Sequence, residues 1–259
     1  LKFGMIPGYG TLGCLTDMRE SAKELDVFIQ KVLAATAAAS NTTSASTQKV
    51  DIVAHSAGAV VARYYLKFLD RQGKQQQEQQ EGEESLQERP GRVRSLVSIA
   101  PVGKGTSVQG FIAMMRVLGI YDSVANIVQQ YCVACVQLLE GSEFMQKLYG
   151  DDGLQGEVPG VRYLNVITSR DEAVTPFING VMEIPEPPKF NEAFGVARTE
   201  IEASPQLQNL VIENHCDFNP NQSDHCGLFQ SPFAFHATNA FLSSDSGAID
   251  TDIPCTFNP

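Results

Sequence analysis

Hydrophobic positions along the chain follow two alternating patterns. Short and nearly continuous apolar runs are typical of buried strands, and they occupy residues 2–6, 50–54, 93–100, 162–168 and 210–213. Apolar side chains that recur every three or four positions predict helices over residues 17–36, 57–70 and 232–242. Strands that alternate with helices predict an α/β fold with a mainly parallel sheet and helices on both of its faces.

Three further segments depart from this alternation. Residues 104–150 have a helical pattern and are unusually apolar for a segment outside the sheet, so we predict a helical cap or lid there. Residues 74–90 are rich in Gln and Glu, which predicts a disordered polar insertion, and residues 37–47 are expected to form a loop. The chain has 259 residues, 43% of them hydrophobic, so we expect one domain over residues 1–259.

Charge and hydropathy exclude several kinds of partner. The formal net charge of −11 argues against nucleic acid, because binding phosphates relies on clustered Lys and Arg. No run of about 18 apolar residues is present, so no transmembrane segment is predicted. The chain begins at Leu1 without a signal segment, from which we expect a mature form or a fragment, and we expect a monomer.

The six cysteines suit an oxidising compartment and therefore a secreted protein. Glycosylation sequons at Asn41 and Asn221 agree with secretion. Cys132 and Cys135 are spaced like half of a zinc site, but no second Cys/His pair with matching spacing follows them. We therefore expect disulfides or buried thiols, and neither a metal nor a cofactor.

The strongest chemical signal is Ser56 in the segment Ala54-His-Ser-Ala-Gly58, between a predicted strand and a predicted helix. This is the setting of a nucleophile elbow, a sharp turn that places the serine Oγ above the sheet. The residues two before and two after the serine must be small, because strand and helix approach each other there. Ala54 and Gly58 are small, although Gly is commoner than Ala at the first position. The alternative is an ordinary strand–helix turn.

A serine nucleophile needs a base, and the base needs an acid that orients it. In this fold class they follow the serine in the order Asp or Glu, then His. Asp171 comes directly after the strand at 162–168, and we favour it over Glu172 and Asp217. For the base we favour His225, in the loop before the last helix, over three other histidines: His215, His55 and His236.

Several segments together carry a family resemblance: Lys49-Val-Asp-Ile-Val-Ala-His-Ser-Ala-Gly58, Asp171-Glu-Ala-Val-Thr-Pro176 and Asp224-His225, with Ser21-Ala-Lys-Glu-Leu25, Arg63-Tyr-Tyr-Leu-Lys-Phe-Leu69, Cys132-Val-Ala-Cys135 and Pro159-Gly-Val-Arg-Tyr163. Over nearly its whole length the chain resembles the secreted triacylglycerol lipases of the class 2 type, which have the α/β-hydrolase fold. The resemblance implies that Ser56, Asp171 and His225 form a catalytic triad.

The resemblance also implies an oxyanion hole. One donor is the backbone N–H of Ala57, the residue after the nucleophile, and the second lies in a loop after an early strand. The fold places two strand–helix units before the elbow strand, whereas only one predicted helix separates residues 2–6 from residues 50–54. We therefore expect residues 2–6 to match the second of these strands. The oxyanion loop would then lie upstream of Leu1 rather than in Pro7-Gly-Tyr-Gly10, and an N-terminal strand would be missing.

These features predict a serine ester hydrolase, foremost a triacylglycerol lipase that meets a lipid or ester substrate at a lipid–water interface. The alternatives are a related carboxylesterase, a cutinase-like hydrolase or an acyltransferase with the same triad, and a non-catalytic lipid-binding relative. The apolar cap would line or cover an acyl-chain pocket, whereas the simpler interpretation of its residues is ordinary core packing.

The acyl-chain role of the cap can be tested with the combined substitution of Met114, Met115 and Leu118 by Ser. Turnover of long-chain esters should fall more than turnover of short-chain esters, because only a long acyl chain would need the apolar surface. The measurement is kcat/KM across p-nitrophenyl esters of increasing chain length. Equal losses at every length would contradict an acyl-binding cap.

Overall fold

The computed structural model describes residues 16–39, 48–70, 91–117, 132–149, 158–182, 207–217, 223–247, 249 and 252–257, together with the backbone of residues 4–6 and 10–12. The predicted insertion at 74–90, both sequons and Cys14 lie outside the described residues. The side chains of Met114, Met115 and Leu118 also lie outside the described set.

Four parallel strands form the main sheet, in the order β3 (Val50–His55), β4 (Val93–Ile99), β5 (Arg162–Ile167) and β6 (Leu207–Val211). The two middle strands are almost entirely buried, as their continuous apolar runs predict. The last strand lies earlier than the predicted 210–213, because the chain turns at Ile212 into a 3₁₀ helix, Ile212–Asn214. Spatial order follows chain order, and all three strand pairings are parallel, so the carboxyl ends of the four strands lie at one edge.

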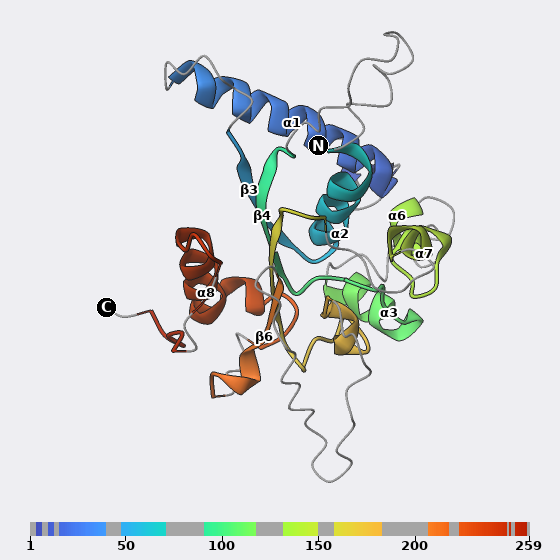
Figure 1. Ribbon diagram of the computed structural model, residues 1–259. Coiled ribbons are helices and arrows are strands. Elements are labelled where there is room, and N and C mark those ends of the chain that lie inside the picture. The colour runs from blue at the N-terminus through green and yellow to red at the C-terminus, as the bar shows by residue number, and fades with distance from the viewer. Residues whose placement is uncertain are drawn as a thin grey trace.

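Helices cover both faces of this sheet (Figure 1). On one side lie α1 (Met18–Ala39) and α2 (Ala57–Tyr64), which a π-helical turn, Tyr65–Leu69, continues. Their core joins residues such as Ile29, Tyr65 and Leu96. On the other side lies α8 (Pro232–Ser243), whose Phe233 and Phe241 pack against β4 and β5. The predicted parallel sheet between helices is confirmed.

Helix α1 is longer than predicted. The Asp17 carboxylate accepts a hydrogen bond from the backbone N–H of Arg19 at 2.8 Å and so caps its start. The helix continues to Ala39, so the expected loop beginning at residue 37 is wrong for residues 37–39. All three are alanines, and alanine has the highest helix propensity, which extends the helix beyond its last core contact.

The N-terminal strand does not join the parallel sheet. Instead β1 (Gly4–Ile6) pairs antiparallel with β2 (Gly10–Leu12) in a separate two-stranded sheet. The prediction of a strand within residues 2–6 is therefore confirmed, but its assignment to the main sheet is wrong. The two strands are separated by only three residues, so their pairing closes a short loop at small entropic cost.

The predicted cap segment contains three described helices: α3 (Val108–Val117), α6 (Val133–Gln137) and α7 (Glu143–Tyr149). A parallel bridge pairs Thr106, near the start of the segment, with Leu139, which lies between α6 and α7. Helix α7 buries Phe144 and Leu148 in a core shared with Val60 of α2. At least this part of the segment therefore packs as ordinary core. Among the described helices, none is both long and apolar enough to cross a membrane.

Two disulfides are present, Cys132–Cys135 and Cys216–Cys255. The second joins the segment after β6 to the C-terminal segment across 39 positions of sequence. Both agree with the expected disulfides, while Cys226 is a free, half-buried thiol. Because Cys132 and Cys135 are bonded to each other, neither offers the thiolate that half a zinc site would require.

An ion-pair network ties α1 to the sheet. The Arg92 guanidinium lies 2.7 Å from Asp26 Oδ1 and 3.1 Å from Asp70 Oδ1. The Asp70 side chain is only 1% exposed, and it also accepts a hydrogen bond from the Tyr65 hydroxyl at 2.9 Å. Burial is the main cause that raises the pKa of this tyrosine, and the Asp70 carboxylate adds to it, so the hydroxyl stays protonated and donates.

Replacing Arg92 by Met should lower the free energy of unfolding by about 3 kcal/mol, because it leaves the buried Asp70 carboxylate without its cation. Urea denaturation at neutral pH measures this. The matched control is Arg94→Met, which removes the more exposed pair with Asp51 and should cost about 1 kcal/mol or less. Equal losses in the two variants would contradict the assigned role of Arg92.

Candidate active site

Ser56 lies in the turn between β3 and α2, at the carboxyl end of its strand. Its φ of 54° and ψ of −127° are unfavourable for a residue with a Cβ atom. Two backbone hydrogen bonds hold the turn: Ser56 N–H donates to the Ile99 carbonyl at 3.0 Å, and Ala59 N–H donates to the Ser56 carbonyl at 3.1 Å. This is the strained strand–helix turn that the elbow motif predicts.

The small residues on either side of Ser56 do approach each other. A Cβ atom added to Gly58 would lie 3.9 Å from the Ala54 Cβ, which is an ordinary van der Waals contact. Alanine would therefore fit at position 58, while a longer side chain would meet Ala54. The small-residue requirement at Gly58 is real but looser than the sequence motif suggests.

His225 joins Ser56 to Asp171 in a chain of hydrogen bonds. Its Nε2 lies 2.8 Å from Ser56 Oγ, and its Nδ1 lies 2.9 Å from both carboxylate oxygens of Asp171. His225 is 3% exposed and Asp171 is 7% exposed, so both side chains are shielded from water, while Ser56 is half-buried. The three residues favoured from the sequence are brought together across 169 positions.

The Asp171 carboxylate is held by its own loop. Its Oδ1 accepts hydrogen bonds from the backbone N–H groups of Ala173 at 3.0 Å and Val174 at 2.7 Å. The Thr168 hydroxyl lies 2.8 Å from the Ser223 carbonyl. This contact connects the loop that carries Asp171, called the acid loop below, to the loop that carries His225, called the base loop. The two backbone donors fix the orientation of the Asp171 carboxylate.

The main chain of His225 is held on both sides. Its N–H donates to Glu172 Oε2 at 3.1 Å, and its carbonyl accepts a hydrogen bond from His55 Nε2 at 3.0 Å. Asp224 Oδ1 accepts from the Gly227 N–H at 2.5 Å and closes the following turn. The contacts of Glu172 and His55 were missed from the sequence. Their only signal is that each is adjacent to Asp171 or Ser56.

The rival site residues lie elsewhere. His215 stacks on Phe233 of α8, with 5.1 Å between ring centroids. His236 lies within α8 and contacts the Thr256 carbonyl at 3.3 Å. Asp217 lies beyond the 3₁₀ helix after β6 and is exposed. No hydrogen bond or ion pair found among the described residues joins these three to Ser56.

Ala57 is the first residue of α2. The N–H groups in the first turn of a helix have no acceptor within that helix, and the helix dipole makes this end positive. The Ala57 N–H lies beside Ser56 at this end of the helix, the position where the sequence predicts an oxyanion donor. The residues of Pro7-Gly-Tyr-Gly10 between the two N-terminal strands lie outside the described residues.

The start of α3 is connected to the acid loop. The Thr106 hydroxyl donates to the Ala173 carbonyl at 2.7 Å, and the Ser107 N–H donates to the Thr175 carbonyl at 2.9 Å. A Cβ atom on Gly110 would collide with the Thr106 and Thr175 hydroxyls, so glycine is required there. The base of the predicted cap thus shares hydrogen bonds with the loop that carries Asp171.

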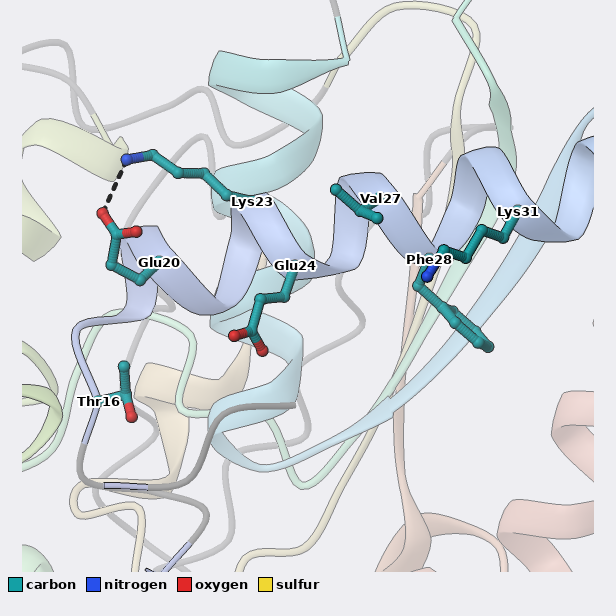
Figure 2. Close-up of a pocket in the computed structure, with 7 residues that line it drawn as sticks. All are labelled: Thr16, Glu20, Lys23, Glu24, Val27, Phe28 and Lys31. Atoms are coloured by element: carbon teal, nitrogen blue, oxygen red, sulfur yellow. Dashed lines mark hydrogen bonds and ion pairs between the residues drawn. The ribbon is translucent and has the colours of Figure 1, made fainter. Parts of the chain in front are cut away.

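A hollow of about 580 Å³ lies on the exposed face of α1, and Figure 2 shows its lining. Glu20 and Lys23 form an exposed ion pair there at 2.7 Å, and Phe28 is 62% exposed. No residue of the Ser56–His225–Asp171 chain lines it. Within the described part of the chain, no three His, Cys, Asp or Glu residues are grouped so as to hold a metal ion.

Comparison with protein-family models shows which family the chain belongs to. The family model described as Lipase (class 2) matches residues 21–184, more than half of the chain. The chain belongs to the class 2 lipase family. The match covers Ser56 and Asp171 of this class 2 lipase sequence but ends before His225. No curated protein sequence matches the chain significantly.

Solved structures similar to this class 2 lipase family member include a lipase and a phospholipase. Lipase B of Aspergillus fumigatus matches with a TM-score of 0.57 and 16% identity over 94% of this chain and 48% of its own. Phospholipase PlaB from Legionella pneumophila matches with a TM-score of 0.41 and 14% identity, over 66% of this chain and 30% of its own. The chain thus spans about half the length of lipase B and a smaller share of phospholipase PlaB. Together with the parallel sheet, the first match confirms the α/β-hydrolase fold.

Burial of His55 should make stability depend on pH. Burial is the main cause that lowers the pKa of His55 below its usual 6.5, and His225 adds to the effect. The His225 carbonyl and Asp171 act in the opposite direction. Below about pH 6.5 the unfolded chain therefore binds a proton at this position more readily than the folded protein does, and stability falls.

Replacing His55 by Gln removes this titration. The free energy of unfolding of the variant should decline less steeply between about pH 7 and pH 5 than that of the wild type. Urea denaturation at a series of pH values measures both slopes. Identical slopes for the two proteins would contradict the assignment of a lowered pKa to His55.

Proposed function

We propose that this protein is a serine ester hydrolase in which Ser56 is the nucleophile, His225 the general base and Asp171 the orienting acid. The observation that carries the proposal is the continuous hydrogen-bonded chain from Ser56 Oγ to His225 to Asp171, with distances of 2.8 and 2.9 Å. Membership of the class 2 lipase family supports the same chemistry.

The arrangement suits proton transfer from serine. When Nδ1–H of His225 donates to Asp171, Nε2 carries a free lone pair directed at Ser56 Oγ. The imidazole accepts the Oγ proton as Oγ attacks the ester carbonyl, and the Asp171 carboxylate stabilises the imidazolium that forms. The negative charge that develops on the carbonyl oxygen faces the Ala57 N–H.

The second half of the reaction reuses the same residues. The His225 imidazolium gives its proton to the departing alkoxide, which leaves an acyl group on Ser56. A water molecule then loses a proton to Nε2 and attacks the acyl carbonyl. The acid is released, and Ser56 Oγ recovers its proton. No cofactor enters any of these steps.

The proposed substrate is a fatty-acyl ester, foremost a triacylglycerol. The class 2 lipase family supports a lipid substrate, and the apolar segment at 104–150 begins beside the acid loop. A related carboxylesterase with the same triad is distinguished by its rates on short, soluble esters. We further propose secretion, because the two disulfides suit an oxidising compartment.

Matched substitutions test the triad. Ser56→Ala should lower kcat on a p-nitrophenyl ester by about 10⁶-fold, because it removes the nucleophile, and Asp171→Asn by about 10⁴-fold, because it removes the group that fixes the tautomer of the base. Their controls are Ser142→Ala and Asp217→Asn, which should leave kcat unchanged because both residues lie outside the hydrogen-bonded chain.

Two results would count against the proposal. A control variant that loses as much activity as its partner would show that the wrong serine or acid had been assigned. A folded wild-type protein without any ester turnover, even on emulsified triacylglycerol, would favour the non-catalytic lipid-binding alternative.

A further inference from the structure

We infer that His55 is a positioning residue that holds the main chain of His225 through a side-chain hydrogen bond. The inference rests on the proposed function, since it concerns the base of the same triad. His55 is the last residue of β3, and its imidazole reaches the base loop across 170 positions of sequence.

The contact is specific in direction. His55 Nε2 lies 3.0 Å from the carbonyl oxygen of His225, so this nitrogen carries the proton and donates. The two imidazole rings are 5.1 Å apart between centroids and tilted by 44°, so they do not stack flat. The Nε2 and Nδ1 atoms of His225 instead face Ser56 and Asp171. Phe229 packs on the His55 ring at 5.2 Å and limits its movement.

The hydrogen bond completes a clamp on the base. The Glu172 carboxylate accepts the His225 N–H, and His55 donates to the His225 carbonyl, so both polar groups of this residue's backbone are fixed. Glu172 directly follows Asp171 in the sequence, and His55 directly precedes Ser56, so each clamping residue is adjacent to another residue of the proposed triad. Movement of the acid loop or of the elbow would therefore carry the base along with it.

The backbone position of His225 matters because it determines where the imidazole ring lies. The ring must keep Nε2 within hydrogen-bond distance of Ser56 while Nδ1 faces Asp171, and a displacement of about 1 Å can reduce a rate by about 10²-fold. The His225 carbonyl would also be left without this protein donor if His55 lost its N–H, which favours a different loop conformation.

Three substitutions separate positioning from simple packing. Gln places its amide nitrogen near the position of the imidazole Nε2, so His55→Gln retains a donor. Asn is one methylene shorter, so its amide cannot reach the carbonyl. Phe keeps a ring of similar size against Phe229 but has no donor. A packing role predicts that Phe is the mildest of these changes, whereas a donor role predicts that Gln is.

The experiment compares kcat, KM and the melting temperature of these three variants with the wild type on a soluble ester. We expect His55→Phe and His55→Asn to lower kcat by about 10- to 100-fold with KM little changed, and His55→Gln to recover most of the loss. Should Phe fail to fold, the Asn and Gln pair still decides the question.

Two outcomes would overturn the inference. In one, the Phe and Asn variants keep the kcat of the wild type. In the other, Gln and Asn lose kcat equally, in proportion to a fall in melting temperature. Failure of the proposed function looks different, since the wild type itself would then show no turnover and no reaction with a fluorophosphonate.

Discussion

The hydrogen bond between Ser56 Oγ and His225 Nε2 depends on the parallel order of the sheet. In a parallel sheet all strands point the same way, so the segments that follow β3, β5 and β6 leave from one edge. These segments carry Ser56, Asp171 and His225 in turn. Neither α1 nor α8 contributes a residue of the proposed triad, but both bury the sheet faces and so hold the strands in register.

The local strain at Ser56 is balanced by contacts made elsewhere. A residue with φ of 54° is costly, and it persists only where the surroundings determine it. Here the Ile99 carbonyl of β4 accepts the serine N–H, and α2 begins immediately after the turn. The acid and base loops are joined through Thr168 and Ser223, and through Glu172 and His225. The site is therefore a set of connected turns rather than three independent side chains.

Local patterns predict most of the fold. The apolar runs place β3, β4 and β5 within one residue at each end, because the pattern of each strand is determined by its own residues. The three residues that the structure joins by hydrogen bonds were also the ones favoured from the sequence, since motif order and strand ends restrict the candidates to a few residues. The position of β6, which lies earlier than predicted, could not be predicted from local patterns. The turn at Ile212 that ends it depends on packing against α8 and neighbouring strands.

Hydrogen bonds between distant segments could not be predicted from the sequence. Glu172 looked like a rival to Asp171, yet it accepts the backbone N–H of His225. His55 looked like a structural neighbour of the nucleophile, yet it donates to the carbonyl of the same residue. The hairpin of β1 and β2 joins neighbouring residues, but whether β1 pairs with β2 or with the main sheet depends on which strands are available for pairing. In each case a hydrogen bond between segments decides the outcome.

The central claim is that Ser56 is a nucleophile activated by His225. Its most direct measurement is the mass of the intact protein after reaction with a fluorophosphonate, followed by mapping of the modified peptide. We expect one adduct per chain, located on Ser56, and a much slower reaction in His225→Gln. A folded protein that remains unmodified, or one modified at another residue, would contradict the claim.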